Sequence, residues 1–245
     1  MEEEEVEIVL NVKDMTIDNI KLNVLVYGKS GTGKTTFACC FPRAYVFDFD
    51  KGMLSQRGRE VEYDTYTSYA DFEVKFRQLE ANCPYETIVL DSVTTLEKYC
   101  MARALAANRR AMPTMNEWNI LIAELTDLFT RATKMSKHLV VVAHEEMVQD
   151  EITGEILIRP QIVGKKLPAQ LPLWFDEVYR AQVSRTKDGI PLYSILTAAD
   201  LKYTAKSRIN CMQPIEDWSK EGKRMDVFEI IMQKIKMTAG GTGGK

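Results

Sequence analysis

The residues with the clearest chemical potential form one glycine-rich run. It matches the Walker A pattern and consists of Gly28, Lys29, Ser30, Gly31, Thr32, Gly33, Lys34 and Thr35. The glycines let consecutive backbone N–H groups turn toward phosphate oxygens without Cβ clashes. The lysine can reach the β- and γ-phosphates, and the threonine hydroxyl can ligate Mg²⁺. We therefore expect this run to hold the phosphates of Mg-ATP.

The elements around the run supply the context that the motif requires. An apolar strand is predicted over Asn23–Tyr27, directly before the glycines, and a helix over Gly33–Cys40, directly after them. The N-terminus of such a helix adds partial positive charge where the phosphates would lie. A chance Gly/Ser turn is the alternative, and it does not account for this strand–loop–helix order.

A second acid is needed to hold the magnesium, and the apolar run Thr87–Leu90 ends directly before Asp91. A carboxylate at the end of a neighbouring buried strand is the partner that a phosphate-binding loop uses for its metal. Asp91 is therefore the predicted metal residue beside Thr35. The alternative role for Asp91 is to cap the following helix, and one carboxylate could do both.

Short apolar runs alternate with helical periodicity, which favours a mostly parallel sheet covered by helices on both faces. The strands expected after the first are Ala44–Phe49, Thr87–Leu90 and Leu139–Ala143. Helices are expected to open at Ser68, over about Thr94–Ala107 and over Glu117–Lys134. The spacing of Thr114 and Glu117 predicts a capping box for the last of these.

After Ala143 the character of the sequence changes. Glu145–Leu173 is polar and contains several glycines and prolines, so long loops are expected there. Strands over Glu177–Val183 and Leu192–Thr197 form a predicted hairpin, and Met225–Ile235 a last amphipathic helix. We divide the chain into an acidic N-terminal segment (1–20), a core (21–212), a C-terminal amphipathic helix region (213–237) and a flexible tail (238–245).

Composition and charge limit the possible classes of function. The net charge is −3, so nucleic acid could be attracted only by a local basic surface. No apolar run approaches the roughly 20 residues of a membrane span, and no membrane partner is expected. The acidic start resembles neither a secretory signal nor a transit peptide, which favours the cytoplasm, or the host cytoplasm for a phage-encoded protein.

The two nucleotide motifs together resemble those of RecA-type recombinase cores, and more closely those of short, phage-type RecA-like ATPases labelled AAA-domain proteins. The resemblance rests on Gly33-Lys34-Thr35-Thr36 and on Ile88-Val89-Leu90-Asp91-Ser92-Val93, and it extends from about Lys21 to Arg208. It implies a RecA-like α/β fold with a C-terminal β-hairpin and helix. It also implies that Thr36 belongs to the nucleotide site.

The resemblance assigns catalytic roles to further residues. An acid after the second strand orients the attacking water in this family, and Asp50 is at the matching position, with Asp48 as the alternative. The family usually has glutamate there, so slow turnover is expected from the shorter side chain. His144, directly after Leu139–Ala143, matches a polar sensor of the γ-phosphate, whereas His138 at the start of that strand is interpreted as structural.

Two cations and a loop region complete what the resemblance implies. Lys206 and Arg208 match a pair that crosses a subunit interface to the neighbour's γ-phosphate, so a homo-oligomer, either ring or filament, is expected. A solvated basic segment is the alternative. The loops that hold single-stranded DNA in the family match Glu145–Leu173, where Arg159, Lys165 and Lys166 are outnumbered by acids.

The leading hypothesis is therefore an ATP hydrolase that is slow, stimulated by DNA, and active on single-stranded DNA in recombination or annealing. Two alternatives remain. One is a nucleotide-gated assembly or binding module with weak hydrolysis, and the other is a small-molecule kinase built on the same phosphate-binding loop. Trp174 and Phe175 could stack on bases, but aromatic residues just before a strand are more often part of a core.

Overall fold

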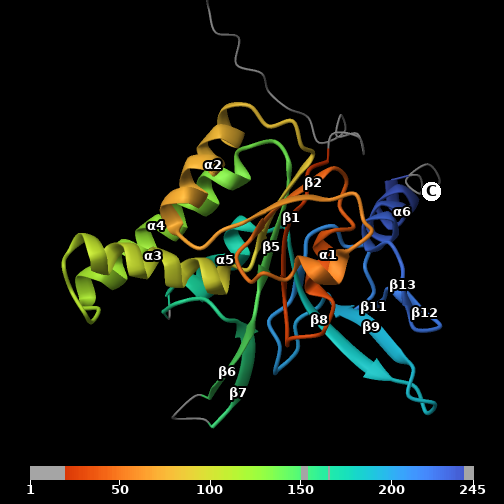
Figure 1. Ribbon diagram of the computed structural model, residues 1–245. Helices are drawn as coiled ribbons and strands as arrows, with labels where there is room; N and C mark the ends of the chain where they lie inside the picture. The colour runs from red at the N-terminus through yellow and green to blue at the C-terminus, as the bar shows by residue number, and fades with distance from the viewer. Residues whose placement is uncertain (1–19, 150–153, 165, 240–245) are drawn as a thin grey trace, which may run out of the picture.

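The computed structural model describes residues 20–149, 154–164 and 166–239. Within these residues one nine-stranded sheet has the order β11-β9-β8-β1-β5-β4-β2-β3, with β10 paired to β8 (Figure 1). The strands are β1 (Asn23–Tyr27), β2 (Ala44–Asp48), β3 (Glu62–Thr65), β4 (Thr87–Asp91), β5 (His138–Ala143), β8 (Glu177–Arg185), β9 (Pro191–Leu196), β10 (Lys206–Ser207) and β11 (Ile215–Asp217).

The six strands from β8 to β3 run parallel, and β9, β10 and β11 join antiparallel. This is the predicted mostly parallel α/β sheet. The apolar strands are buried on both faces because helices cover both sides. The helices are α1 (Lys34–Ala38), α2 (Tyr69–Ala81), α3 (Val93–Ala107), α4 (Met115–Thr133), α5 (Lys166–Trp174) and α6 (Val227–Ala239), with a short 3-10 helix, η3 (Met53–Gln56).

Two hydrophobic cores lie on opposite faces of the sheet. Helices α2, α3, α4 and α5 pack on one face, where Phe72 and Phe129 contact Phe47 and Phe175 within one buried cluster. Helices α1 and α6 pack on the other, together with Trp218. Figure 1 shows α2–α4 on one side of the strands and α1 with α6 on the other. No helix in the described part of the chain is long and apolar enough to cross a membrane.

The predicted capping box opens α4 as expected. The Thr114 side chain accepts a hydrogen bond at the start of the helix, and the Glu117 carboxylate accepts the Thr114 backbone N–H at 2.7 Å. Glu117 is fully buried and also accepts from Asn108 at 2.8 Å. A hydrogen bond from the Thr114 hydroxyl, together with these two, lowers the pKa of the Glu117 carboxyl to about 2. The cap therefore also ties the end of α3 to the beginning of α4.

The expectation of long loops over Glu145–Leu173 is wrong in two places. The first part folds into an antiparallel hairpin of β6 (Glu145–Gln149) and β7 (Ile156–Pro160), which projects from the body of the protein (Figure 1). The second part forms α5, in which Leu167 and Leu171, four residues apart, are buried. Phe175 is also buried against Phe129 with ring centroids 5.7 Å apart, so it belongs to the core.

The C-terminal region is part of the same unit as the main sheet. β11 pairs with β9, and a small hairpin of β12 (Ser219–Lys220) and β13 (Lys223–Arg224) follows. The last helix begins at Val227 and reaches Ala239, so it starts later and ends later than the expected Met225–Ile235. The acidic segment up to residue 19 and the glycine-rich end from 240 lie outside the described residues.

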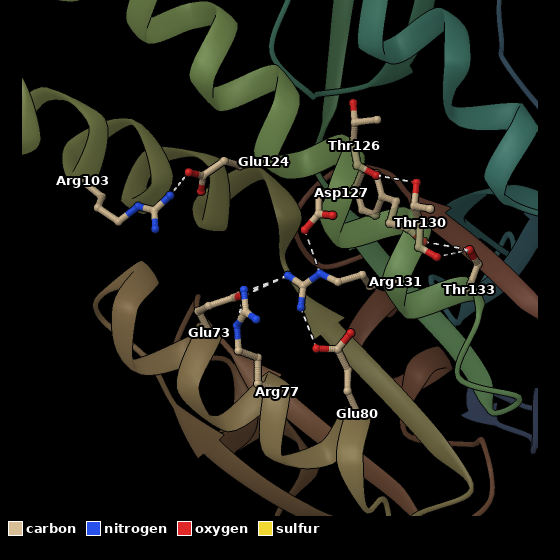
Figure 2. A network of polar contacts seen from close by, with 11 residues as sticks. Glu73, Arg77, Glu80, Arg103, Glu124, Thr126, Asp127, Thr130, Arg131 and Thr133 are labelled. Carbon is tan, nitrogen blue, oxygen red and sulfur yellow. Dashed lines mark hydrogen bonds and ion pairs between the residues drawn. The ribbon is translucent and has the colours of Figure 1, made fainter.

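Arg131 of α4 joins two acids of α2 and one acid of its own helix (Figure 2). Its guanidinium nitrogens lie 3.0 Å from Glu73, 2.6 Å from Glu80 and 2.7 Å from Asp127. The Arg131, Glu73 and Glu80 side chains are all less than a quarter exposed. Because loss of one partner leaves partly buried charges unpaired, we expect Arg131→Met to lower the free energy of unfolding by about 2–4 kcal/mol.

The matched control for Arg131 is Arg77→Met on the same network. Arg77 contacts Glu73 at 2.7 Å, but its side chain is 68% exposed. An exposed pair of this kind contributes at most about 1 kcal/mol. Urea denaturation of the two variants and the wild type measures the difference. Equal stability of Arg131→Met and Arg77→Met would show that the network contributes no more than a surface ion pair.

His138 at the start of β5 is buried, and its Nδ1 accepts the Leu22 backbone N–H at 3.2 Å. Burial, aided by the charge of Lys21, lowers its pKa from 6.5 to about 4. At pH values above 6.5 neither the folded nor the unfolded chain is protonated there. As the pH falls from 6.5 toward 4, only the unfolded chain takes up the proton, so stability decreases and then levels off below pH 4.

Replacing His138 with asparagine keeps a hydrogen-bond acceptor at this position and removes the titrating group. We expect the free energy of unfolding of His138→Asn to depend less on pH between 6.5 and 4, with a difference from wild type of at most ~3 kcal/mol across that window. Chemical denaturation at a series of pH values measures this. Parallel pH profiles for the two proteins would contradict the assignment.

Candidate active site

The glycine-rich loop connects β1 to α1, and two of its glycines are required by close neighbours. A Cβ on Gly28 would lie 2.5 Å from the backbone oxygen of Ala181 in β8. Gly33 has φ +89°, and a Cβ there would lie 3.1 Å from the Trp218 ring. Side chains at these positions would collide with backbone or with a buried ring, so the loop keeps its shape only with glycine.

The Lys34 ammonium lies across the loop. Its Nζ donates to the backbone oxygens of Gly28 at 2.9 Å and of Lys29 at 2.8 Å. The side chain is almost fully buried. Burial lowers the pKa of Lys34, while the charges of Asp91 and Asp50 act in the opposite direction. Since the group has flexible carbons and rotatable donors, it can turn from these carbonyls to phosphate oxygens.

Thr35 and Asp91 meet as predicted, with Thr35 Oγ1 donating to Asp91 Oδ2 at 2.6 Å. Asp91 is the last residue of β4, the Asp91–Ser92 peptide is cis, and Ser92 precedes α3 as its N-cap position. Burial, together with the charges of Asp50 and Asp48, raises the pKa of Asp91 to about 6.

This donor set fits Mg²⁺. A hydroxyl and a buried carboxylate are hard oxygen ligands, and Mg²⁺ takes its remaining ligands from water and from nucleotide phosphates. Thr35 would ligate the ion directly and Asp91 would hold it through water. The ion would supply charge neutralisation between phosphate oxygens, and it would offset the cost of a charged Asp91 in a buried place.

Asp50 and His144 contact each other, and the charge of Asp50 acts on nearby Asp91. His144 Nε2 lies 3.1 Å from Asp50 Oδ2, and each side chain is partly exposed. Burial opposes the charge of Asp50, but hydrogen bonds from His144 and Thr95 outweigh it and hold its pKa at about 2. Asp50 is therefore a carboxylate at neutral pH, able to orient a water molecule but weakly basic.

Asp48, the alternative to Asp50, is placed differently. It is buried, and its carboxylate accepts the Gly52 backbone N–H at 3.0 Å and the Thr65 hydroxyl at 3.3 Å. These contacts hold the turn after β2 against β3. Asp48 does not line the cavity described below, whereas Asp50 does.

The structure gathers most of the predicted residues in one cavity at the carboxyl edge of the parallel strands, where ligands bind in folds of this type. The cavity has a volume of about 630 Å³. Its lining contains Ser30, Gly31, Gly33, Lys34, Thr35, Thr36, Phe49, Asp50, Gly52, Ser55, Asp91, Thr95, His144 and Arg224.

Lys206 and Arg208 lie elsewhere. β10 pairs with the first residues of β8, which places both cations toward the opposite edge of the sheet. Lys206 Nζ donates to the backbone oxygen of Phe175 at 3.0 Å, and Arg208 lies 3.0 Å from the Asp176 carboxylate. The two side chains reach the same turn before β8, as expected for an extended segment. Within one chain they do not meet the cavity.

Arg224 is the residue that sequence reasoning missed. It comes from β13, far along the chain, and its Nη1 donates to Thr36 Oγ1 at 2.6 Å. Gln56 of η3 donates to the same oxygen at 3.0 Å. The only local signal is the Glu221-Gly222 pair, a turn signal before Arg224, and it does not show which surface the turn would reach.

Comparisons with known proteins identify a family for this chain. A family model described as an AAA domain matches residues 20–209. No curated protein matches the chain. Among solved structures, the chain is similar to a KaiC-like protein from the hyperthermophilic archaeon Pyrococcus horikoshii, with a TM-score of 0.44, 14% identity, and coverage of 71% of this chain and 77% of that one. Because this family model spans most of the chain, the chain belongs to the AAA domain family that the model describes.

Proposed function

We propose that the chain binds Mg-ATP in this cavity and hydrolyses it slowly, in an oligomer that acts on single-stranded DNA. The observation that carries the proposal is the presence of two polar pairs in the lining of one cavity. Thr35 and Asp91 would place the metal, and Asp50 and His144 lie 3.1 Å apart beside them. Lys34 and the loop amides would bind the β- and γ-phosphates.

Asp50 would orient the attacking water, and His144 would sense the γ-phosphate. In the structure His144 contacts Asp50 directly, so a phosphate or water entering between them would move the imidazole. The low pKa of Asp50 and its short side chain support slow turnover, because a weak base takes up little of the water's proton.

The backbone of His144 links the nucleotide cavity to the projecting hairpin of β6 and β7. Its N–H donates to the Thr94 hydroxyl at 3.0 Å, and its oxygen accepts the Gln161 N–H at 2.8 Å, just after β7. A second cavity of about 440 Å³ lies between the glycine-rich loop and the hairpin, and His144 lines both cavities. This continuity supports the proposal that the nucleotide state sets the position of the hairpin.

The same hairpin is the proposed contact for single-stranded DNA in recombination or annealing. Met147 and Leu157 on it are exposed apolar side chains that bases could pack against. Arg159 is paired with Glu146 at 2.7 Å, so its charge is largely engaged. Lys165 lies outside the described residues, and the side chain of Lys166 is not described. The binding is therefore expected to be weak and salt-sensitive.

ATPase assays at several protein concentrations, with and without oligothymidylate, test the proposal. The rate per chain should rise steeply with concentration and again with DNA. A rate per chain that is independent of both would leave an ATPase without the proposed assembly or DNA partner. Tight ATP binding without turnover would support a nucleotide-gated assembly module, which the short Asp50 favours. Transfer of phosphate to a metabolite would support a kinase.

A further inference from the structure

The small hairpin of β12 and β13 carries a cation into the nucleotide cavity. Arg224 lines the cavity, and its Nη1 donates to Thr36 Oγ1 at 2.6 Å. Its guanidinium also lies over the Tyr193 ring, 5.1 Å from the ring centroid. Lys34 and Arg224 are the lysine and arginine side chains among the described residues of the lining, which also contains the acids Asp50 and Asp91.

The chain before Arg224 is built to hold this position. Glu221 and Gly222 both have positive φ, at +51° and +77°, as a tight two-residue hairpin turn requires. The turn is anchored by Trp218, which is fully buried. Its backbone accepts the Met225 N–H at 2.8 Å on the far side of the hairpin. A short, paired hairpin with a buried ring at its base fixes the backbone position of Arg224.

The anchor is in direct contact with the phosphate loop. The Trp218 ring is the nearest group to the place where a Cβ on Gly33 would lie. The same ring packs edge-on against Phe37 of α1, with ring centroids 6.2 Å apart. The Trp218 backbone N–H donates to the Tyr193 oxygen at 3.0 Å. The loop, the first turn of α1 and the hairpin therefore share one packed surface, and a ligand on the loop is within reach of the hairpin's cation.

We propose that Arg224 binds the nucleotide through its α-phosphate end, which ADP and ATP share, together with Thr36. The inference rests on the proposed nucleotide function. The γ-phosphate end is marked by the metal pair Thr35–Asp91 and by Asp50–His144. Thr36 is the next residue of α1, and Arg224 approaches it from the separate C-terminal hairpin.

A guanidinium suits this task. It carries five N–H donors in a planar fork, so one nitrogen can keep its hydrogen bond to Thr36 while the others donate to phosphate oxygens. The aromatic ring of Tyr193 beneath it fixes the plane of the fork. Lysine would keep the charge but would lose both the fork and the stacking. Arg224 is therefore a binding residue of the non-transferred part of the nucleotide.

Fluorescence titrations with a fluorescent ADP and a non-hydrolysable fluorescent ATP analogue, both with Mg²⁺, test this inference. Arg224→Gln should lower the affinity for both nucleotides by the same factor, about 10- to 100-fold, because it removes charge-assisted hydrogen bonds made to both. Arg224→Lys should fall between wild type and Arg224→Gln. Lys223→Gln, an exposed neighbour on the same strand that does not line the cavity, should stay within about twofold of wild type.

Each outcome has a distinct meaning. Unchanged affinities in Arg224→Gln would overturn the inference, as would a loss confined to the ATP analogue, which would place Arg224 at the γ-phosphate. If wild-type protein binds neither nucleotide, the proposed function itself fails. Thermal unfolding without nucleotide shows whether the variants are folded. If Arg224→Gln does not fold, the nucleotide affinities of Arg224→Lys, the smaller change, still test the inference.

Discussion

Replacing Arg208 with alanine is expected to lower ATP turnover in the assembled protein by about 10³–10⁵-fold, the effect of removing an arginine that neutralises transition-state charge. In the isolated chain Arg208 is half-exposed and pairs with Asp176 at 3.0 Å. An exposed pair contributes at most about 1 kcal/mol, so Arg208 can leave Asp176 for a neighbour's γ-phosphate at little cost. Steady-state phosphate release at saturating ATP measures the loss.

The decisive form of this experiment uses mixed assemblies. Asp50→Ala removes the acid proposed to orient the attacking water, and Arg208→Ala removes the arginine proposed to reach the neighbour's γ-phosphate, so each variant alone should be inactive. In an equal mixture about a quarter of head-to-tail interfaces combine an intact Asp50 with an intact Arg208 from the neighbour, and activity should return to that extent. Absence of rescue would show that Arg208 does not act across an interface. Arg185→Ala, at the exposed end of β8, is the matched arginine control.

Replacing Lys34 with alanine is expected to abolish measurable turnover and to weaken ATP binding by about 100-fold or more, because charge-assisted hydrogen bonds to two phosphates are lost. The backbone carbonyls of Gly28 and Lys29 also lose the hydrogen bonds that they accept from Lys34. The binding loss is measured by titration with a fluorescent ATP analogue, and the turnover loss by phosphate release.

Two controls make the Lys34 result specific. Lys134→Ala removes an exposed lysine at the end of α4, far from the cavity lining, and should behave as wild type. Thermal unfolding of Lys34→Ala without nucleotide shows whether the variant is folded, since the buried ammonium and its two hydrogen bonds to loop carbonyls are lost. ATP affinity in Lys34→Ala equal to that of wild type would place the nucleotide somewhere else.

The phosphate site could be predicted from the sequence because its residues are nearly contiguous. One strand, one loop and one helix position Gly28, Lys34 and Thr35, and local residue types determine all three elements. Asp91 could be predicted for a related reason, since the carboxyl ends of parallel strands meet at one edge of the sheet. Asp50 and His144 follow the same rule, and the structure brings them within 3.1 Å of each other.

The remaining features depend on contacts between segments that are distant in the chain. β6 and β7 are only partly buried and show no clear alternation of polar and apolar residues. In α5 the sequence suggested a loop because of its prolines, but Pro168 falls in the first turn, where its missing N–H costs nothing. Arg224 could not be found, because only the packing of Trp218 against Gly33 brings its hairpin to the cavity.

A crystal structure of the protein with Mg²⁺ and a non-hydrolysable ATP analogue tests most directly whether the glycine-rich loop is the nucleotide site. We expect a triphosphate surrounded by the amides of this loop, with Lys34 Nζ turned from its two carbonyls to phosphate oxygens. We also expect a metal bound to Thr35 Oγ1 and held through water by Asp91. A triphosphate bound away from this loop, or a metal that Thr35 does not ligate, would contradict this expectation.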